Sequence, residues 1–520
     1  MSKSGNAAVQ KSKRGLLKMV FSRTMVITLL LMANFALVLA LGFRVVQGLP
    51  IVLGSVLLFT VVMELIVLNG RGDATVKLTW SILVAILPIF GAVMYFFVRV
   101  DLGNRVNRKL LDTSIRAGEP FVPEQTRVYD KLRQEAPEIC GLACYLRDYA
   151  MAPVYENTSV EYFPLGEDKF ARMVEELEKA EKFIFLEYFL VSEGHMWNTV
   201  LEILECKAAQ GVEVRFLYDG MNAFYNLPYS YPRELAKKGI RCKMFAPVRP
   251  FVSTHYNNRD HRKILVIDGH TAFTGGINLE DCYINRGSRY GHWKDTAVML
   301  KGDGARSFTL MFLQMWNATE TIRDFAPYLL PVGSGNLSDG YVIPYGDSPT
   351  DGENVGEMVY LNILNQAKRY VYIMTPYLIL DGEMATALKF AAKRGVDVQL
   401  ILPHIPDKRS AFVLAKGHYG ELLEAGVKIY EYTPGFVHAK VFLCDDEQAV
   451  VGTINLDYRS LYHHFECAAY LYRVPALADI REDFQVTREK CCRIDREDVK
   501  NRSLLQRLTG GLLKVFAPLM

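Results

Sequence analysis

Residues 261–268 read HRKILVID, and residues 275–280, six positions further on, read GGINLE. The same pattern returns in the second part of the chain, where residues 438–445 read HAKVFLCD and residues 452–457 read GTINLD. Each copy has the form H-x-K-x4-D, six residues, then G-x-I-N-L-[DE]. One H-x-K-x4-D motif arises easily by chance. Two copies with the same downstream spacing indicate a duplicated half-site.

Each copy places an imidazole and an ammonium group together. His261 and Lys263 are two residues apart, as are His438 and Lys440, so on a strand each pair points to one face. The apolar residues that follow each lysine predict a buried strand. We therefore expect both pairs to be held rigidly at the edge of a core.

The turn after each strand adds an amide, because Asn278 and Asn455 follow its glycine. Two facing halves would offer two imidazoles, two cations and two amides. This set suits a phosphodiester: one histidine can attack phosphorus and the other can protonate the leaving alkoxide. The lysines and asparagines would bind the phosphoryl oxygens. This chemistry needs neither a metal nor another cofactor.

Four carboxylates accompany the motifs. Asp268 and Asp445 close the H-x-K-x4-D copies and complete the candidate catalytic set, chiefly as structural supports of the strand–turn junction. Asp295 in His-Trp-Lys-Asp and Glu466 in His-His-Phe-Glu stand at matching places before a strand. A carboxylate on the far imidazole nitrogen would fix the tautomer and stabilise the imidazolium.

Both parts of the chain repeat a strand–helix–strand pattern, which is typical of a parallel sheet. Residues 183–190 and 212–218 are predicted strands around a helix at 196–210; the second part repeats this order with strands at 370–374 and 396–402 around a helix at 383–394. Residues 211–215 and 395–399 also match in sequence, so the duplication covers whole domains. We assign the halves to residues 156–335 and 336–500.

The N-terminal region predicts a membrane anchor at residues 24–98, after a basic arm at 1–23. Its apolar segments at 24–43, 49–68 and 78–98 are each long enough to span a bilayer. Residues 99–155 are a predicted linker, and residues 501–520 form an amphipathic tail that either packs on the core or lies at the membrane interface.

The positive-inside rule puts both the arm and the basic stretch after residue 98 in the cytoplasm, which three full spans cannot achieve. Pro88 and Gly91 make 78–98 a candidate for a bent segment. We expect a multi-pass protein of the cell membrane whose catalytic region faces the cytoplasm.

Composition excludes several other classes. A net charge of +3 gives no sign of the basic groove that nucleic acid requires. The nine cysteines form no C-x-x-C pair, which argues against a metal site or a disulfide framework. The G-x-S-x-G elbow of serine hydrolases and the P-loop of nucleotide enzymes are both absent from the sequence.

The paired motifs resemble the phospholipase D superfamily, and the surrounding sequence is most similar to bacterial cardiolipin synthases. The similar stretches run from about residue 50 to the end and include NNRDHRK at 257–263, GHWKD at 291–295, ILPHIPD at 401–407 and YEYTPGFVHAK at 430–440. The resemblance implies an α/β fold of two pseudo-symmetric phospholipase D-type halves packed together, preceded by transmembrane helices. The family pattern has two membrane spans, whereas this chain offers three.

The resemblance also implies a reaction. Two phosphatidylglycerol molecules become cardiolipin and glycerol through a phosphatidyl-histidine intermediate, with His261 as the nucleophile and His438 as the acid and base. A phospholipase D-type hydrolase, a phosphatidyltransferase with another acceptor alcohol, and an inactive membrane scaffold are the alternatives. Nothing in the sequence indicates the oligomeric state.

Overall fold

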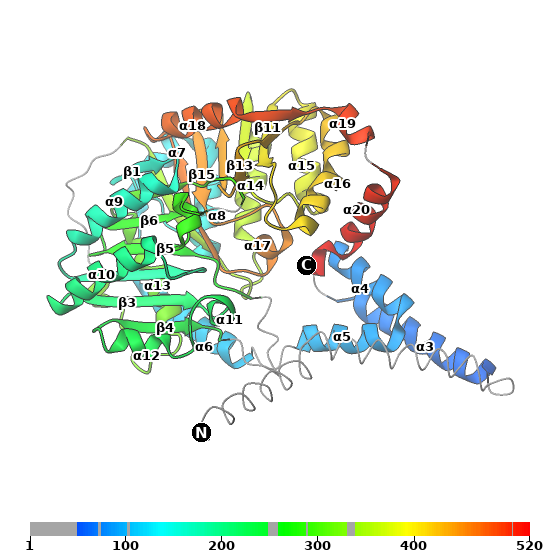
Figure 1. Cartoon of the computed structure of the whole chain (residues 1–520), viewed down its shortest axis with the longest axis horizontal. Helices are drawn as coiled ribbons and strands as arrows, with labels where there is room; N and C mark the ends of the chain where they lie inside the picture. Colours follow the sequence, from blue (N-terminus) through cyan, green and yellow to red (C-terminus); the bar gives the residue numbers. More distant parts are fainter. Residues whose placement is uncertain are drawn as a thin grey trace, which may run out of the picture. The chain divides into compact units, whose positions relative to one another are not determined.

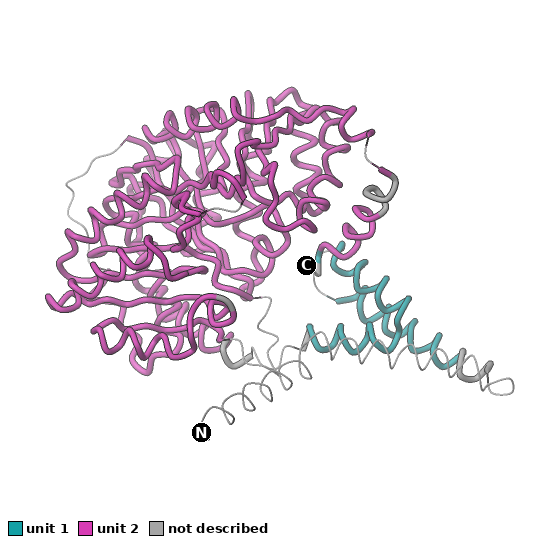
Figure 2. The backbone as a smooth tube through the Cα atoms, viewed as in Figure 1, with its two compact units in different colours: residues 1–106, 248–256, 518–520 teal, residues 107–247, 257–517 magenta. Residues whose placement is uncertain are grey.

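The structure is a computed structural model that describes residues 49–70, 74–100, 105–247, 258–287, 290–329, 339–501 and 503–519 (Figure 1). The chain divides into two compact units (Figure 2). Residues 107–247 and 257–517 form the large unit, and residues 1–106, 248–256 and 518–520 form the small one. The predicted arm at 1–23 and apolar segment at 24–43 lie outside the described residues.

The first half of the large unit is built on a seven-stranded sheet in the order β1-β8-β6-β5-β2-β3-β4. Strands β2, β3 and β4 run parallel, as the sequence predicts, whereas the motif strand β5 runs antiparallel to β2. The strands, in sheet order, are Thr158–Phe163, Ala297–Gly302, Thr271–Gly275, Lys263–Ile267, Phe183–Tyr188, Glu213–Asp219 and Arg241–Phe245.

The second half repeats this topology in an eight-stranded sheet with the order β17-β12-β11-β10-β14-β15-β16-β9. Read from β9, the order is that of the first sheet with β17 added at the edge. The strands, from β17 to β9, are Cys491–Ile494, Lys428–Tyr432, Asp397–Pro403, Tyr370–Met374, Val441–Cys444, Gln448–Gly452, Glu466–Tyr472 and Tyr341–Asp347. The shared order confirms the two related α/β halves.

Helices cover the outer face of each sheet. In the first half they are α9 (Gly166–Glu178), α10 (His195–Ala209), α11 (Asn222–Tyr225) and α12 (Tyr231–Ala236), with the short helix η2 (Asp281–Ile284). The short helix η3 (Ala326–Tyr328) lies on the inner face, where Tyr328 packs against Phe183 and Phe185. In the second half the outer helices are α14 (Val355–Gln366), α15 (Gly382–Lys393), α16 (Arg409–Ala425), α17 (Tyr458–Tyr462) and α19 (Arg496–Lys500). Helix α18 (Leu477–Glu489) instead packs on the inner face of this sheet, in the core between the two sheets. Figure 1 shows α15 and α16 beside β11.

The two sheets share one hydrophobic core. Phe185 and Val266 of the first half lie in the same buried cluster as Val441 and Val451 of the second. Helix α13 (Ala305–Asn317) fills this cluster, and all its residues except Arg306 are buried. A helix buried on all sides is apolar around its circumference. Between the halves, strands β7 (His292–Lys294) and β13 (Gly435–Val437) pair in parallel.

The predicted linker contains α6 (Arg105–Gly118), η1 (Glu119–Phe121), α7 (Thr126–Glu135) and α8 (Pro137–Ala150). Leu132 of α7 and Leu146 of α8 are fully buried in the core of the second half. In the tail, α20 (Leu504–Phe516) packs against α16 and is followed by η4 (Ala517–Leu519). This is the packed alternative of the two expected for the tail.

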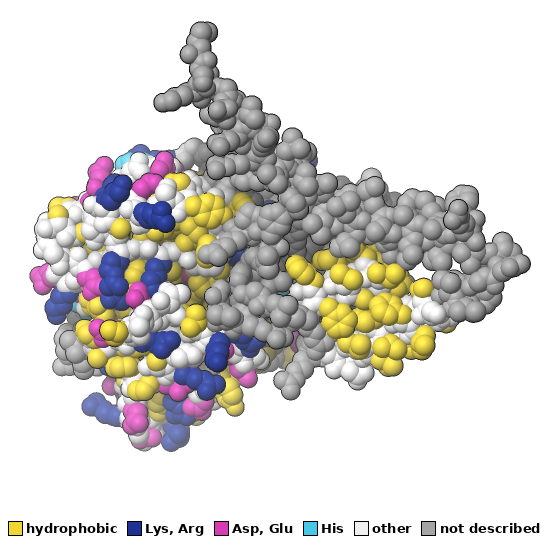
Figure 3. Space-filling view, turned by 90° about the horizontal axis from the view of Figure 1, so that it is seen from below, with side chains coloured by type: hydrophobic (Ala, Val, Ile, Leu, Met, Phe, Trp, Pro, Cys, Tyr) yellow, Lys and Arg dark blue, Asp and Glu magenta, His cyan; other side chains and the backbone are white. Residues whose placement is uncertain are grey.

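The small unit contains α3 (Leu49–Leu68), α4 (Ala74–Ile86) and α5 (Pro88–Val100). The segment at 78–98 is bent, as Pro88 and Gly91 indicated: α4 ends before Pro88, and α5 folds back on it. A Cβ on Gly91 would lie 2.8 Å from the carbonyl oxygen of Leu83, and the rings of Trp80 and Tyr95 meet at 5.6 Å. Within the described residues, no helix combines the length and the apolar character that crossing a membrane requires. Apolar side chains gather on the face of this unit seen in Figure 3.

Candidate active site

The two motif histidines meet where the halves join. Each is held by the backbone of the opposite half: His261 donates its N–H to the carbonyl of Phe465 at 2.9 Å, and His438 donates its N–H to that of Lys294 at 2.7 Å. Each acceptor directly precedes one of the carboxylates Asp295 and Glu466. The pairing of the halves therefore brings each histidine beside the other half's acid.

The imidazole–carboxylate contacts are consequently crossed. Nδ1 of His261 lies 2.9 Å from both oxygens of Glu466, and Nδ1 of His438 lies 2.6 Å from Oδ2 of Asp295. Both acids are 0% exposed. A carboxylate at Nδ1 keeps the proton on that nitrogen, which leaves Nε2 of the neutral ring as the nucleophilic atom.

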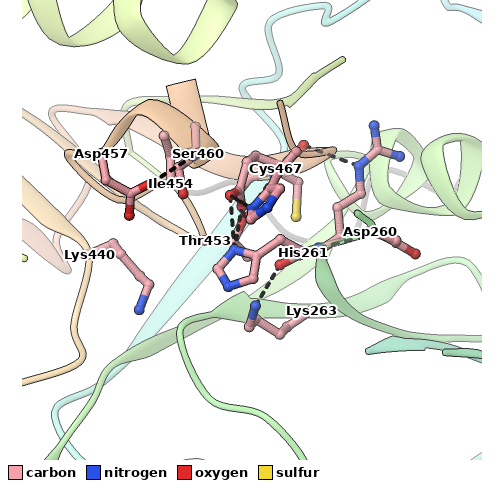
Figure 4. A network of polar contacts seen from close by, with 12 residues as sticks. Asp260, His261, Lys263, Lys440, Thr453, Ile454, Asp457, Ser460 and Cys467 are labelled. Atoms are coloured by element: carbon pink, nitrogen blue, oxygen red, sulfur yellow. Dashed lines mark hydrogen bonds and ion pairs between the residues drawn. The ribbon is translucent and has the colours of Figure 1, made fainter. Parts of the chain in front are cut away.

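The two lysines lie beside these imidazoles. Lys263 donates to the carbonyl of His261 at 2.5 Å, and Lys440 donates to the carbonyl of His438 with its Nζ 2.9 Å from Nδ1 of that ring. Figure 4 shows the ammonium groups of Lys263 and Lys440 near the His261 ring. Burial lowers the pKa of Lys263 to about 8 and that of Lys440 to about 7. Burial therefore disfavours the charged form of both lysines, and an anionic ligand would stabilise that form.

Burial and the same cations act on the imidazoles. Burial, followed by Lys263 and Lys440, holds the pKa of His261 well below its ordinary value. Burial and Lys440 lower the pKa of His438 to about 4, although Asp295 opposes them. These effects favour the neutral form of both rings, and a bound phosphodiester would offset the cations and raise both pKa values.

The two asparagines of the G-x-I-N turns differ in their hydrogen bonds. Asn278 accepts the N–H of Leu190 at 3.0 Å and donates to the hydroxyl of Tyr283 at 2.7 Å, so its amide is largely occupied. Tyr283 packs edge-on against His438 at 5.4 Å between ring centroids. The Oδ1 of Asn455 is buried and has no hydrogen-bond partner among the described residues. Of the two, Asn455 is the amide with an unused group at the site.

Asp268 and Asp445 lie at the other end of the motif strands, each seven residues after its histidine, which is about 23 Å for an extended chain. Asp268 accepts the backbone N–H groups of residues 181–183 at 2.7–2.8 Å. Asp445 accepts those of residues 368–370 at the same distances. Each carboxylate fastens the start of the neighbouring parallel strand, and neither touches an imidazole.

Sequence reasoning missed two rings that lie over the imidazoles. Trp293 lies 5.4 Å from His438, and His464 lies 5.4 Å from His261. Their position could have indicated a role at the site, because each stands two residues before one of the carboxylates Asp295 and Glu466. Both nitrogens of His464 are buried without a hydrogen-bond partner in the described part of the chain, and Nδ1 lies 3.7 Å from Glu466.

The two halves also differ in the residue that follows the first glycine of the turn, which is Gly276 in the first half and Thr453 in the second. Sequence reasoning missed this difference. Thr453 donates its hydroxyl to Glu466, as Figure 4 shows by the dashed line from Thr453. At the matching position, a Cβ on Gly276 would lie 2.1 Å from Oδ1 of Asp295. The longer glutamate leaves room for a threonine, whereas Asp295 occupies that space itself.

At the candidate active site, one group of side chains has the donor atoms of a metal site. Atoms of His261, His464 and Glu466 lie within 4.8 Å of one another. The ammonium groups of Lys263 and Lys440 nevertheless surround His261 closely enough to lower its pKa, and they would repel a dication. We therefore assign these residues to anion chemistry.

Comparison with known proteins identifies the family. Residues 173–292 and 360–487 match the family described as "Cardiolipin synthase, PLD-like domain". A cardiolipin synthase of Alkalihalophilus pseudofirmus is 33% identical over 86% of this chain and 89% of its own length. An uncharacterized protein of Streptococcus mutans is 53% identical over 88% of this chain and 99% of its own length.

A solved structure shows the same fold at low sequence identity. The phosphatidylserine synthase of Haemophilus influenzae aligns with a TM-score of 0.54 and 16% identity, over 69% of this chain and 93% of that one. The identity to the cardiolipin synthases extends through both halves and the region before them. The chain therefore belongs to the cardiolipin synthase family of phospholipase D-like proteins and is a phosphatidyltransferase.

Proposed function

We propose that the protein transfers a phosphatidyl group from one phosphatidylglycerol to a second, giving cardiolipin and glycerol. The observation that carries this proposal is the pair of crossed histidine–carboxylate contacts beside two buried lysines. This arrangement can bind a phosphodiester and provides both a nucleophile and a proton donor. The reaction then proceeds in two displacements at phosphorus.

In the first displacement, Nε2 of His261 attacks phosphorus, and the bond from phosphorus to the headgroup glycerol oxygen breaks. The imidazolium of His438 donates its Nε2 proton to that oxygen, so glycerol leaves neutral. We assign the acid role to His438 because Asp295 makes a single short contact to it and favours its protonated form. Glu466 contacts His261 at 2.9 Å through both oxygens and also accepts the hydroxyl of Thr453, while the other oxygen of Asp295 accepts the N–H of Thr296.

In the second displacement, neutral His438 accepts the proton of a headgroup hydroxyl from a second phosphatidylglycerol. The alkoxide oxygen attacks phosphorus, the phosphorus–nitrogen bond breaks, and His261 is restored. Lys263, Lys440 and the Nδ2 group of Asn455 would donate to the equatorial oxygens throughout, and Glu466 would stabilise the positively charged phosphatidyl-imidazolium.

We further propose that the small unit attaches the enzyme to the cell membrane, where both substrates reside. Its exposed side chains include Leu57 and Leu58 at 66% and Ile86 at 68%. Isolated exposed leucines are ordinary, but a cluster of this kind marks a lipid or protein contact. By the positive-inside rule, the basic residues that follow α5 favour a catalytic unit on the cytoplasmic side.

The test is conversion of labelled phosphatidylglycerol by the purified protein in detergent micelles, with no nucleotide added. We expect cardiolipin and free glycerol from the wild type and neither from His261→Ala or His438→Ala. A lipid–protein adduct should accumulate in His438→Ala at low rate and be absent from His261→Ala. Phosphatidic acid as the only product would identify a hydrolase. No conversion by the folded wild type would refute the proposal and support the scaffold alternative.

A further inference from the structure

Arg262 is a buried cation that takes no part in either displacement. It stands between His261 and Lys263 in the first motif and is 5% exposed. Its Nε donates to the backbone carbonyl of Glu466 at 3.1 Å, and a Cβ on Gly346 would lie 3.2 Å from its Nη2. Glu466 and Gly346 belong to neighbouring strands of the second half, β16 and β9. One side chain of the first half therefore reaches the main chain of two strands of the other.

The residue that Arg262 holds by its carbonyl is the carboxylate partner of the nucleophile. Glu466 is the first residue of β16, and the ladder between β15 and β16 begins only at Ala468. A strand end is held by fewer ladder bonds than the middle of a strand and shifts more easily. Since both oxygens of Glu466 lie 2.9 Å from Nδ1 of His261, a shift of about 1 Å would break this contact.

Two buried acids accompany Arg262. Its Nη1 lies 3.9 Å from Oε1 of Glu187, and its backbone N–H donates to Oδ1 of Asp260 at 3.3 Å. Both acids are 0% exposed. Figure 4 shows the side chain of Asp260 turned away from the ring of His261. We therefore expect the acids to act on the imidazole through the arginine and not directly.

The two acids are best paired when they share one proton. Both oxygens of Glu187 and Oδ2 of Asp260 are buried without a hydrogen-bond partner in the described part of the chain. Burial, followed by the charge of Asp260, raises the pKa of Glu187 well above its ordinary value. A proton on Glu187 would satisfy an oxygen of Asp260, and one negative charge would remain for the guanidinium of Arg262. The three side chains are then neutral as a group.

The second half has apolar residues in place of this charged group. Glu187 pairs with Ile264 across β2 and β5. At the equivalent place in β10 and β14, Met374 pairs with Val441. By these pairs and by distance from the motif histidines, the equivalents of Glu187, Asp260 and Arg262 are Met374, Val437 and Ala439. All three are buried in the core that the sheets share. Because the second half forms the same strand order without the charges, their role is not to form the sheet.

We propose that Arg262 is a positioning residue for the nucleophile. It fixes the main chain at Glu466, so that both carboxylate oxygens stay on Nδ1 of His261. Glu187 and Asp260 hold the arginine in place. The inference rests on the proposed transfer reaction, in which His261 attacks phosphorus, and adds a residue to that site. The imidazole of the second half has an alanine at the equivalent place, so the arginine distinguishes the nucleophile from the acid.

The first experiment replaces Arg262 by methionine, which keeps the length of the side chain and removes its charge. In the conversion of phosphatidylglycerol by Arg262→Met, kcat should fall at least about tenfold, the effect of one hydrogen bond to a charged group. The KM should stay within about threefold, because the arginine acts on His261 through Glu466 and not on the bound lipid.

A second readout needs no lipid chemistry. Diethyl pyrocarbonate acylates neutral imidazole nitrogens, and mass spectrometry of the digested protein gives the rate at each histidine. In Arg262→Met the rate at His261 should fall at least about fivefold, because its ring loses the carboxylate that makes it a stronger nucleophile. The rate at His438 should stay within about twofold, since Asp295 remains on its ring.

Variants of the two acids separate positioning from stability. Glu187→Gln keeps a neutral group that can donate to Asp260, so it should retain more of kcat than Glu187→Met. The triple variant Glu187→Met, Asp260→Val, Arg262→Met should be at least as stable as the wild type, since apolar residues often replace a buried ion group without loss. Its kcat and its acylation rate at His261 should nevertheless stay low.

Arg215→Met is the matched control. Arg215 is a buried arginine of β3 in the same half, and its Nη2 lies 2.7 Å from Oε1 of Glu213. Its loss removes a buried charge of the same kind without touching β16. We expect lower stability but an unchanged kcat and unchanged acylation rates at both motif histidines.

The outcomes separate this proposal from the reaction itself. An unchanged kcat in folded Arg262→Met, or an acylation rate at His261 that does not fall, would overturn the positioning role while leaving the transferase in place. Equal falls at His261 and His438, or an equal loss in Arg215→Met, would also overturn it, since the arginine would then act through general stability. If the wild type made no cardiolipin, the proposed reaction would fail, whereas the acylation rates would still test the contact between Arg262 and Glu466.

Discussion

Gly276→Ala tests the crossed contacts with one methyl group. The new Cβ would lie 2.1 Å from Oδ1 of Asp295, and such contacts are essentially never shorter than 3.0 Å, so the carboxylate has to move by about 1 Å. The 2.6 Å contact to His438 then lengthens to about 3.6 Å, which is no longer a hydrogen bond. A displacement of this size at a reacting group costs about 10²-fold in rate.

The assay is the conversion of phosphatidylglycerol to cardiolipin, with thermal unfolding of the same preparation. We expect Gly276→Ala to lose about 10²-fold in kcat, while overpacking lowers the free energy of unfolding by about 1–3 kcal/mol. Thr453→Ala is the matched control, because it lies at the equivalent position of the other half. It removes one hydroxyl donor from Glu466 without adding bulk, so its loss should be about tenfold.

The refuting result is a folded Gly276→Ala protein whose kcat stays within about threefold of the wild type. Asp295 would then not position His438 during turnover, whatever its distance in the resting site. A loss in Thr453→Ala equal to that in Gly276→Ala would also contradict the explanation, since the two substitutions would then act through the turn itself.

Three further outcomes follow from the contacts. Asp268→Asn and Asp445→Asn should each lower the free energy of unfolding by about 2 kcal/mol in urea titrations and leave kcat nearly unchanged, because each carboxylate binds three backbone N–H groups and no imidazole. The kcat/KM for anionic lipid should fall as pH rises through about 7, since Lys440 carries its charge only below its lowered pKa; Lys440→Arg should remove this limb of the pH profile. His464→Phe should raise the free energy of unfolding by about 1 kcal/mol, because two buried nitrogens that have no hydrogen bond among the described residues are replaced by an apolar ring.

The duplication made most of the fold predictable. Each half repeats strands and helices whose periodicity and closing glycines are visible in the sequence, and Gly211, Gly395 and Gly426 all have positive φ after their helices. The strand order within each sheet was beyond prediction, as was the reversal of β5 against β2. These depend on pairing between segments far apart in the chain, which no local pattern records.

Hydropathy alone does not show the break in the segment at 78–98, which Pro88 and Gly91 indicate. A count of apolar residues measures transfer to lipid but not continuity of the helix, and Pro88 lacks the N–H that would continue α4. Asn278 shows the same limit on a smaller scale. Its residue type suggested a phosphate ligand, yet its oxygen accepts the N–H of Leu190, 88 positions earlier in the chain.

The crossed contacts explain why two copies are kept in one chain. Each half holds an imidazole whose carboxylate belongs to the other, so neither half has a complete site until the shared core around α13 has formed. Within this common frame, the halves differ where a two-step reaction distinguishes its groups. Glu466 accepts a hydrogen bond from the hydroxyl of Thr453, whereas Asp295 packs against Gly276, which has no side chain. The two imidazoles therefore have carboxylate partners in different surroundings.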